Sequence, residues 1–94
     1  MNVIDPPRVD TFRGRRVTTA HMVSTLLGYD GTRELCDFAR SIGMDVAWIQ
    51  HPGEPREHFD LIGVARCDAA VRAGVTVDRR LLGLTLIAKR KAVP

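Results

Sequence analysis

Apolar residues follow two different spacings along the chain, and each spacing predicts its own kind of element. Recurrence every three or four positions predicts a helix over residues 33–42, with Leu35, Phe38, Ala39 and Ile42 on its buried side. The same spacing predicts a second helix over residues 61–73, whose buried stripe is Val64, Cys67 and Val71. Short runs rich in β-branched residues predict strands. These strands lie over residues 2–4, 17–24, 45–50 and 75–77.

Residues with capping propensity mark the ends of these helices. Asp30 or Thr32 is placed to cap the first helix, and Asp60 stands directly before the second. Gly43 and Gly74 follow the last apolar position of each helix, where a left-handed glycine commonly ends it.

The last segment, residues 78–94, fits two interpretations. Asp78 can cap a basic helix, whereas "LTLIA" can form an edge strand. The helix is favoured, and residues 88–94 are expected to form a flexible basic tail.

The order strand, helix, strand, helix, strand is typical of crossover connections between parallel strands. We therefore predict one α/β domain over residues 1–94, with a mostly parallel sheet of about four strands covered by two or three helices. Ligands of such sheets bind beyond the carboxyl ends of the strands. Those ends carry Asp5, residues 21–24, Gln50 and His51, which would together form a polar rim.

Composition narrows the class of protein. The chain has 94 residues, 45% of them apolar and 27% charged, which is typical of a folded domain rather than a disordered chain. No apolar run is long enough to span a membrane, and "MNVIDPPRVD" lacks a signal-peptide pattern, so we expect a cytoplasmic protein. Cys36 and Cys67 fall on apolar helix faces, which favours reduced core thiols over a disulfide or a zinc site.

The net charge of +3 is concentrated in two basic patches, "RGRR" at residues 13–16 and "KRK" at residues 89–91. Such patches attract nucleotides, nucleic acid and other anions, or are simply solvated surface. The chain has only five aromatic residues, three Phe, one Trp and one Tyr, for stacking on bases. A small anionic ligand is therefore favoured over nucleic acid.

Three polar side chains form the principal candidate site. His58 and Asp60 share one face of an extended segment, where a carboxylate can orient an imidazole. We assign Asp60 to helix capping and His58 to ligand contact. His21 is either a histidine bonded to backbone within its strand or a third site residue. The set can make a two-histidine, one-carboxylate metal site, but capping competes for Asp60 and the spacing fits no familiar ligand signature. No metal and no cofactor are therefore predicted.

The remaining candidates surround this set. Ser24 ends its strand without a nucleophile-elbow pattern, so serine catalysis is weakly supported. Gln50 and His51 end the following strand. Arg56 and Arg66 flank the loop and the start of the second helix, where guanidinium groups and free N–H groups suit a phosphate.

A rival motif overlaps the third predicted strand. Ala39, Gly43 and Ile49 have the spacing of a helix-turn-helix, whose recognition helix would be "MDVAWIQHPG". That segment is β-branched and broken by proline, so a strand fits it better. In a strand, Trp48 and Val46 would face the core, although a Trp48 ring at the strand end could stack on a base.

Several pieces of the chain, "IDPP", "AHMVS", "ELCDFARSIG", "EHFDL", "AVRAGV" and "RRLL", occur in a familiar order. From Ile4 to about Leu82 the chain resembles a small family called domain of unknown function four thousand and thirty-one. Thr25 is a departure, since members tend to carry an acid there. The family occurs in phages and actinobacteria and fused to HD-type phosphohydrolase domains. The resemblance thus implies nucleotide-related ligands, for example a host immune signal sequestered by a viral protein.

Two functions from different classes stay open. Binding of a phosphate-bearing or nucleotide-derived ligand without catalysis is favoured, because arginines and a helix N-terminus occur without a recognisable nucleophile. The alternative is a phosphodiesterase-like hydrolase that uses His21 and His58 as an acid–base pair, with Asp60 beside them. A homodimer would suit so small a core.

Overall fold

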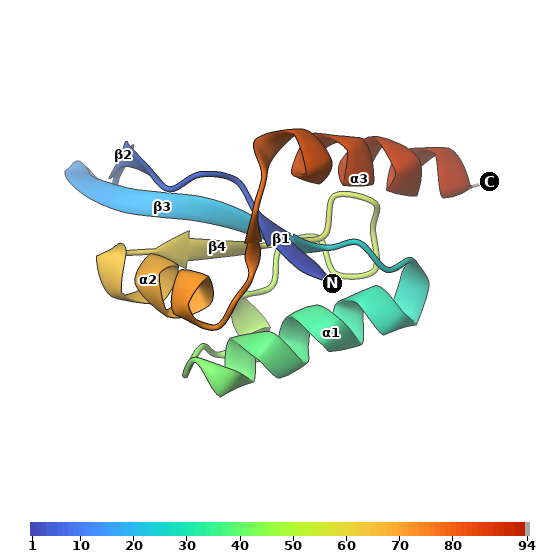
Figure 1. Cartoon of the computed structure of the whole chain (residues 1–94), viewed down its shortest axis with the longest axis horizontal. Helices are drawn as coiled ribbons and strands as arrows, with labels where there is room; N and C mark the ends of the chain where they lie inside the picture. The colour runs from blue at the N-terminus through green and yellow to red at the C-terminus, as the bar shows by residue number, and fades with distance from the viewer. Residues whose placement is uncertain (94) are drawn as a thin grey trace.

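A computed structural model describes residues 1–93 of the chain. A five-stranded mixed sheet carries three α-helices and one 3₁₀ turn (Figure 1). The elements follow in the order β1 (Asn2–Ile4), β2 (Arg8–Phe12), β3 (Arg15–Ser24), α1 (Gly28–Ser41), η1 (Val46–Trp48), β4 (Phe59–Ile62), α2 (Val64–Arg72), β5 (Thr76–Val77) and α3 (Arg79–Ala92).

β3 is the centre of the sheet, because three strands pair with it. β1 and β2 lie along one edge and β4 along the other, all antiparallel, and only β5 pairs in parallel, with β1. The predicted mostly parallel sheet is therefore wrong. The physical reason is a tight hairpin between β2 and β3, where Arg13 and Gly14 take positive φ values of 51° and 77°. This hairpin returns the chain directly and replaces a crossover helix.

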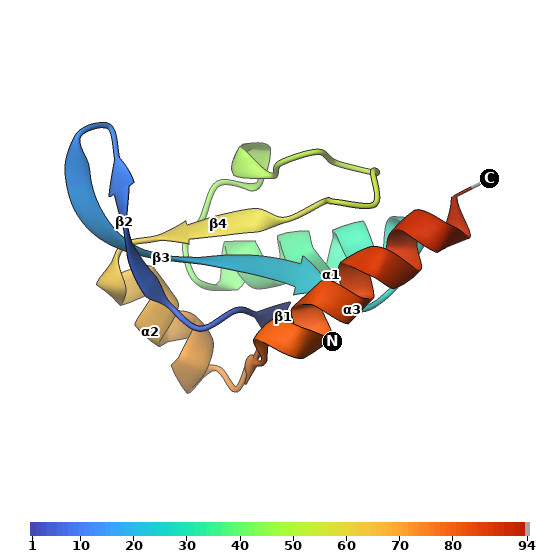
Figure 2. The same ribbon diagram turned by 90° about the horizontal axis from the view of Figure 1, so that it is seen from above.

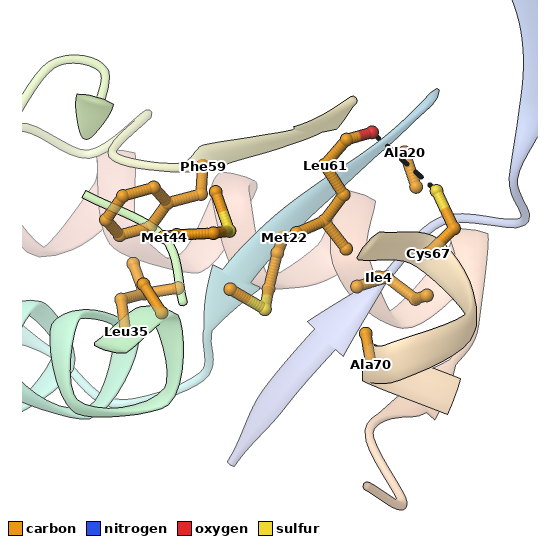
Figure 3. Close-up of a cluster of buried hydrophobic side chains, with 10 residues drawn as sticks. Ile4, Ala20, Met22, Leu35, Met44, Phe59, Leu61, Cys67 and Ala70 are labelled. Atoms are coloured by element: carbon orange, nitrogen blue, oxygen red, sulfur yellow. Dashed lines mark hydrogen bonds between the residues drawn. The ribbon is translucent and has the colours of Figure 1, made fainter. Parts of the chain in front are cut away.

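Alternation along the strands gives the sheet two unlike faces. Helices α1 and α2 cover one face, while α3 covers only one end of the other (Figures 1 and 2). The covered face carries the main core, in which Met22, Phe59 and Leu61 pack with Leu35 of α1 and Cys67 of α2 (Figure 3).

The opposite face has a smaller apolar layer beneath α3. Val3, Val23 and Leu82 form this layer, with Leu81 and Leu86 packed against it. Beyond α3, toward the β2–β3 hairpin, the face is left without a covering helix (Figure 2). Polar side chains of β3 and β4 on this face are therefore accessible.

Residues 45–50, predicted as a strand, form the 3₁₀ turn η1 instead. The Asp45 side chain accepts a hydrogen bond from the backbone N–H of Ala47 at 2.9 Å, which favours a local turn over strand pairing. Trp48 is 47% exposed rather than buried, and Val46 is half-buried. Because no recognition helix exists here among residues 1–93, the helix-turn-helix is not formed.

The second predicted helix also begins later than expected. Residues 59–62 form β4, and α2 starts after Gly63, whose φ of 101° suits only glycine well. Asp60 therefore does not cap a helix. Val64 and Val71 are exposed, because Cys67 and Ala70 make the buried stripe.

Helix α1 likewise begins earlier than the predicted residue 33, at Gly28. Its N-cap is Leu27, without a side-chain hydrogen bond, so neither Asp30 nor Thr32 caps it. Leu35 and Ala39 are buried as expected, whereas Phe38 and Ile42 are half-buried.

Several other predictions are confirmed. The C-terminal segment is a helix, and Asp78 caps it by accepting the Leu81 N–H at 2.9 Å. Gly43 and Gly74 have the expected left-handed φ values, 79° and 85°. Both cysteines are free.

The basic end of the chain differs from the prediction. Residues 88–92, expected in a flexible tail, continue α3, and Pro94 lies outside the described residues.

Candidate functional site

A cluster of polar side chains lies on the uncovered part of the sheet. His21 of β3 and Asp60 of β4 are direct partners in the antiparallel register, so their side chains point to the same face. His58 is two residues before Asp60 and therefore points to that face as well. The pairing of β3 with β4 thus brings His21 close to His58 and Asp60, which follow it by 37 and 39 positions in the sequence.

The Asp5 side chain contacts both the backbone N–H and the ring of His21. Its carboxylate accepts the backbone N–H of His21 at 2.6 Å, and its Oδ2 lies 3.1 Å from Nδ1 of the same residue. Arg8 donates to that carboxylate at 2.9 Å and balances its charge. Since the Asp5 side chain is only 13% exposed, it forms a fixed support for the imidazole ring.

His58 is fixed by its own backbone and by the loop before it. The backbone N–H and carbonyl of His58 pair with Gln50 at 3.1 and 2.8 Å. Nδ1 lies 2.8 Å from the Arg56 carbonyl oxygen, and Nε2 lies 3.3 Å from Oδ1 of Asp60. Each ring nitrogen of His58 therefore lies beside an oxygen atom, and these two contacts orient the ring.

A buried carboxylate anchors the loop that carries His58. Glu57 is 3% exposed and accepts hydrogen bonds from the Thr32 hydroxyl and the Gly53 N–H, both at 2.6 Å. These bonds tie residues 53–57 to α1. We therefore assign Glu57 to positioning the loop rather than to contacting a ligand.

The two charged neighbours shift each other's titration. The hydrogen bond to Asp60 raises the pKa of His58, against the opposing effect of burial. The same hydrogen bond lowers the pKa of Asp60, with the charges of His58, His21 and Arg8 acting in the same direction. His58 therefore keeps its proton to a higher pH, and Asp60 keeps its negative charge to a lower pH, than the same side chains would in isolation.

The three side chains converge. Nε2 of His21 lies 3.8 Å from Oδ1 of Asp60, and the two imidazole rings are 5.5 Å apart in an edge-on arrangement. One ligand atom from each of His21, His58 and Asp60 can be chosen so that all lie within 4.8 Å of one another. Such a set can transfer protons or hold a metal ion.

Open hollows meet at this cluster. The largest, of about 500 Å³, runs from Asp60 to Trp48, Arg66, Phe12 and Arg13. A second, of about 220 Å³, lies between the two histidines and the apolar side of α3 and reaches Arg56. A ligand larger than one phosphate group can therefore contact the cluster.

The structure brings together most of the predicted site residues but not all of them. Gln50 and Arg66 line the large hollow, and Arg56 the smaller one. The His51 ring is 6.1 Å from that of His58. Ser24 lies apart from the cluster, because three positions separate it from His21 and its side chain points to the opposite face of the sheet.

Ser24 instead links the end of β3 to α1 and to the loop between them. Buried beside α1, it donates to Glu34 at 2.6 Å and accepts the Leu26 N–H at 3.0 Å. The expected rim at the strand ends is wrong, since the cluster lies on the face of the sheet.

Sequence reasoning missed the contribution of β2, which supplies Arg8 and Phe12. The alternation of polar and apolar residues in "RVDTF", followed by the "RG" turn, was the available signal. Asp5 was placed among the polar residues, but its bond to His21 depends on strand pairing.

The chain belongs to the family described as "Protein of unknown function (DUF4031)", whose model matches residues 3–89. No curated protein and no solved structure matches the chain. Among the described residues, no helix has the length and apolar character needed to cross a membrane.

Proposed function

We propose that this protein binds a small phosphate-bearing ligand of the nucleotide type on the uncovered sheet face. The observation that carries the proposal is that Asp60 belongs to the histidine–aspartate cluster and also lines the large hollow. The hollow and the cluster are therefore continuous. A ligand with a flat ring at one end and a phosphate at the other would match these two regions.

The far end of the hollow offers a flat, partly aromatic surface. The guanidinium group of Arg66 lies 4.8 Å from the centre of the Trp48 ring, and that of Arg13 lies 5.4 Å from the Phe12 ring. Exposed aromatic rings and guanidinium planes are the usual stacking partners of nucleobases. The same arginines give this end of the hollow positive charge, which attracts an anionic ligand.

Hydrolysis of the bound ligand is the second candidate, and one observation favours it. Asp5 orients His21 as a carboxylate orients a general base, while the raised pKa of His58 suits a general acid. In that reaction His21 would take a proton from the attacking water, and His58 would give one to the leaving oxygen. The P–O bond to the leaving group breaks as the new P–O bond forms.

Trp48 gives a direct test because it is the only tryptophan of the chain. A panel of mono-, di- and cyclic nucleotides should include at least one that changes its fluorescence and shows saturable binding by calorimetry. Arg66→Gln should weaken that binding about 10- to 100-fold, the range expected for the loss of a stacking contact with a base.

Arg33→Gln is the matched control. Arg33 is 70% exposed on α1, across the sheet from the hollow, so its loss should leave affinity unchanged. Absence of binding by every nucleotide, or equal weakening by both substitutions, would contradict the proposal. Ligand recovered intact after heat release would favour binding alone, whereas cleaved ligand would favour hydrolysis.

A further inference from the structure

We propose that His21, His58 and Asp60 form a centre for one divalent transition-metal ion, bound by two imidazole nitrogens and one carboxylate oxygen. The objection from the sequence was that Asp60 is needed as a helix cap. The structure removes that objection, because Asp60 lies within β4 and makes no capping bond.

The neighbours of each histidine determine which nitrogen is free. Nδ1 of His21 faces a carboxylate oxygen of Asp5, which only accepts hydrogen bonds when ionised, so Nδ1 carries the proton. Nδ1 of His58 faces the Arg56 carbonyl oxygen, which also only accepts. Nε2 of each ring also faces an acceptor, Oδ1 of Asp60, but at a longer distance: 3.8 Å against 3.1 Å at Nδ1 for His21, and 3.3 Å against 2.8 Å for His58. The nearer acceptor therefore favours the neutral tautomer with the proton on Nδ1 and the lone pair on Nε2.

Both Nε2 atoms point toward the same oxygen. They lie 3.8 Å and 3.3 Å from Oδ1 of Asp60. Ligand atoms placed ~2.0–2.2 Å from a tetrahedral metal ion stand about 3.4 Å apart. Two of the three ligand–ligand distances are thus near this value, and all three atoms lie within 4.8 Å of one another, so small side-chain rotations would close the set around an ion.

Support of both Nδ1 groups by oxygen acceptors is the usual outer arrangement of metal-binding histidines. Simple proton exchange with Asp60 would require only one histidine to be oriented in this way. Here a partly buried carboxylate and a backbone carbonyl, from separate parts of the chain, orient two rings toward one point.

The donor set selects the class of ion. Imidazole nitrogens favour zinc and its transition-metal neighbours, whereas magnesium and calcium favour oxygen donors. Three protein ligands leave at least one coordination position open, as in catalytic rather than structural zinc sites. One hollow lined by His21 and Asp60 and another lined by His21 and His58 lie beside the cluster, so a ligand could reach an ion held there.

The ion would also explain how a phosphate group approaches two carboxylates. Asp5 is balanced by Arg8, and a bound divalent ion would place more positive charge beside Asp60 than the proton of His58 does. This step rests on the proposed function, since it makes a phosphate oxygen the occupant of the open position. The metal site itself rests only on the geometry of the three side chains.

Equilibrium dialysis of the tag-free protein against Zn²⁺, without any nucleotide, tests the inference. One ion per chain is expected, with Co²⁺ giving the visible absorption of a low-coordinate site and Mg²⁺ not competing. His58→Asn and Asp60→Asn should each weaken Zn²⁺ binding at least about 10-fold. His51→Asn, which changes the remaining histidine of the chain, should have no effect.

Asp5→Asn adds a test of positioning. An amide NH₂ facing Nδ1 of His21 would move the ring proton to Nε2, and affinity should fall about 10- to 100-fold. Thermal melts without metal show whether each variant is folded, and Asp60→Asn retains the shape of the side chain if others fail to fold.

Absence of stoichiometric Zn²⁺ binding, or equal loss in the His51→Asn control, would overturn the metal site. Because nucleotide is absent from this experiment, failure here leaves nucleotide binding by Arg66 and Trp48 to be judged on its own titration. Conversely, Zn²⁺ binding without any nucleotide binding would support the metal site and contradict the proposed function.

Discussion

Replacing Phe59 by alanine should lower the free energy of unfolding by about 3–5 kcal/mol, the range for deleting a buried aromatic ring. Phe59 is fully buried between the sheet and α1, where it packs with Met44 and Leu35 (Figure 3). The strand that carries it also carries Asp60. The loss of this ring should therefore disturb the candidate site together with the core.

Phe12 and Phe38 give a graded comparison in chemical denaturation at constant pH. Phe12 is 45% exposed, so Phe12→Ala should change the free energy of unfolding by no more than about 0.5 kcal/mol. Phe38 is half-buried, and the cost of Phe38→Ala should fall between those of the other two substitutions. Equal losses for Phe59→Ala and Phe12→Ala would show that β4 does not pack as described.

Gly31→Ala should destabilise the fold by about 1–3 kcal/mol, because the new methyl group would overlap neighbouring atoms. A Cβ atom on Gly31 would collide with the backbone carbonyl of Leu26 and stand 3.5 Å from Oγ of Ser24. The carbonyl belongs to the short loop between β3 and α1 and has little room to move. Close approach of helix and loop is therefore the reason for glycine here.

Gly83→Ala is the matched control within another helix. A Cβ atom on Gly83 of α3 would meet no heavy atom within 4 Å, so alanine should stabilise the helix by about 0.5–1 kcal/mol. The melting temperatures of the two variants should thus move in opposite directions. If Gly31→Ala is neutral or stabilising, the described contact between loop and helix is wrong.

Some local features of the fold were predicted correctly, whereas the Asp30 or Thr32 cap was wrong and the turn at Asp45 was missed. Asp78 and the basic segment after it predicted α3, and Gly43 and Gly74 predicted the ends of two helices. Helix caps and left-handed glycines depend only on residues a few positions away. Asp60 was misread for the same reason: an acid before an apolar stripe is a good local cap, but "FDLI" also alternates. Pairing of β4 with β3 buries Phe59 and Leu61, and this non-local contact determined the outcome.

The same difference between local signals and non-local strand pairing applies to the candidate site. His21, His58 and Asp60 were identified as candidates from their residue types, but their arrangement depends on register between strands separated by α1 and η1. The support of His21 by Asp5 depends on a second pairing, between β1 and β3. Neither register could be derived from spacing, so the sequence placed the site at the strand ends instead of on the sheet face.

The central claim is that His21 and His58 both turn Nε2 toward Asp60, and the chain is well suited to measuring it. Only three histidines are present, so proton–nitrogen NMR spectra of the imidazole rings should contain three sets of signals. The signals report which nitrogen carries the proton and how each ring titrates with pH.

At a pH above the titration of His58, both His21 and His58 should carry the proton on Nδ1. His58 should titrate above its ordinary pKa of 6.5, since Asp60 stabilises the charged ring, and Asp60→Asn should bring that pKa down. His51 serves as the internal reference. A proton on Nε2 of His21 or His58, or an unchanged His58 titration in Asp60→Asn, would contradict the account.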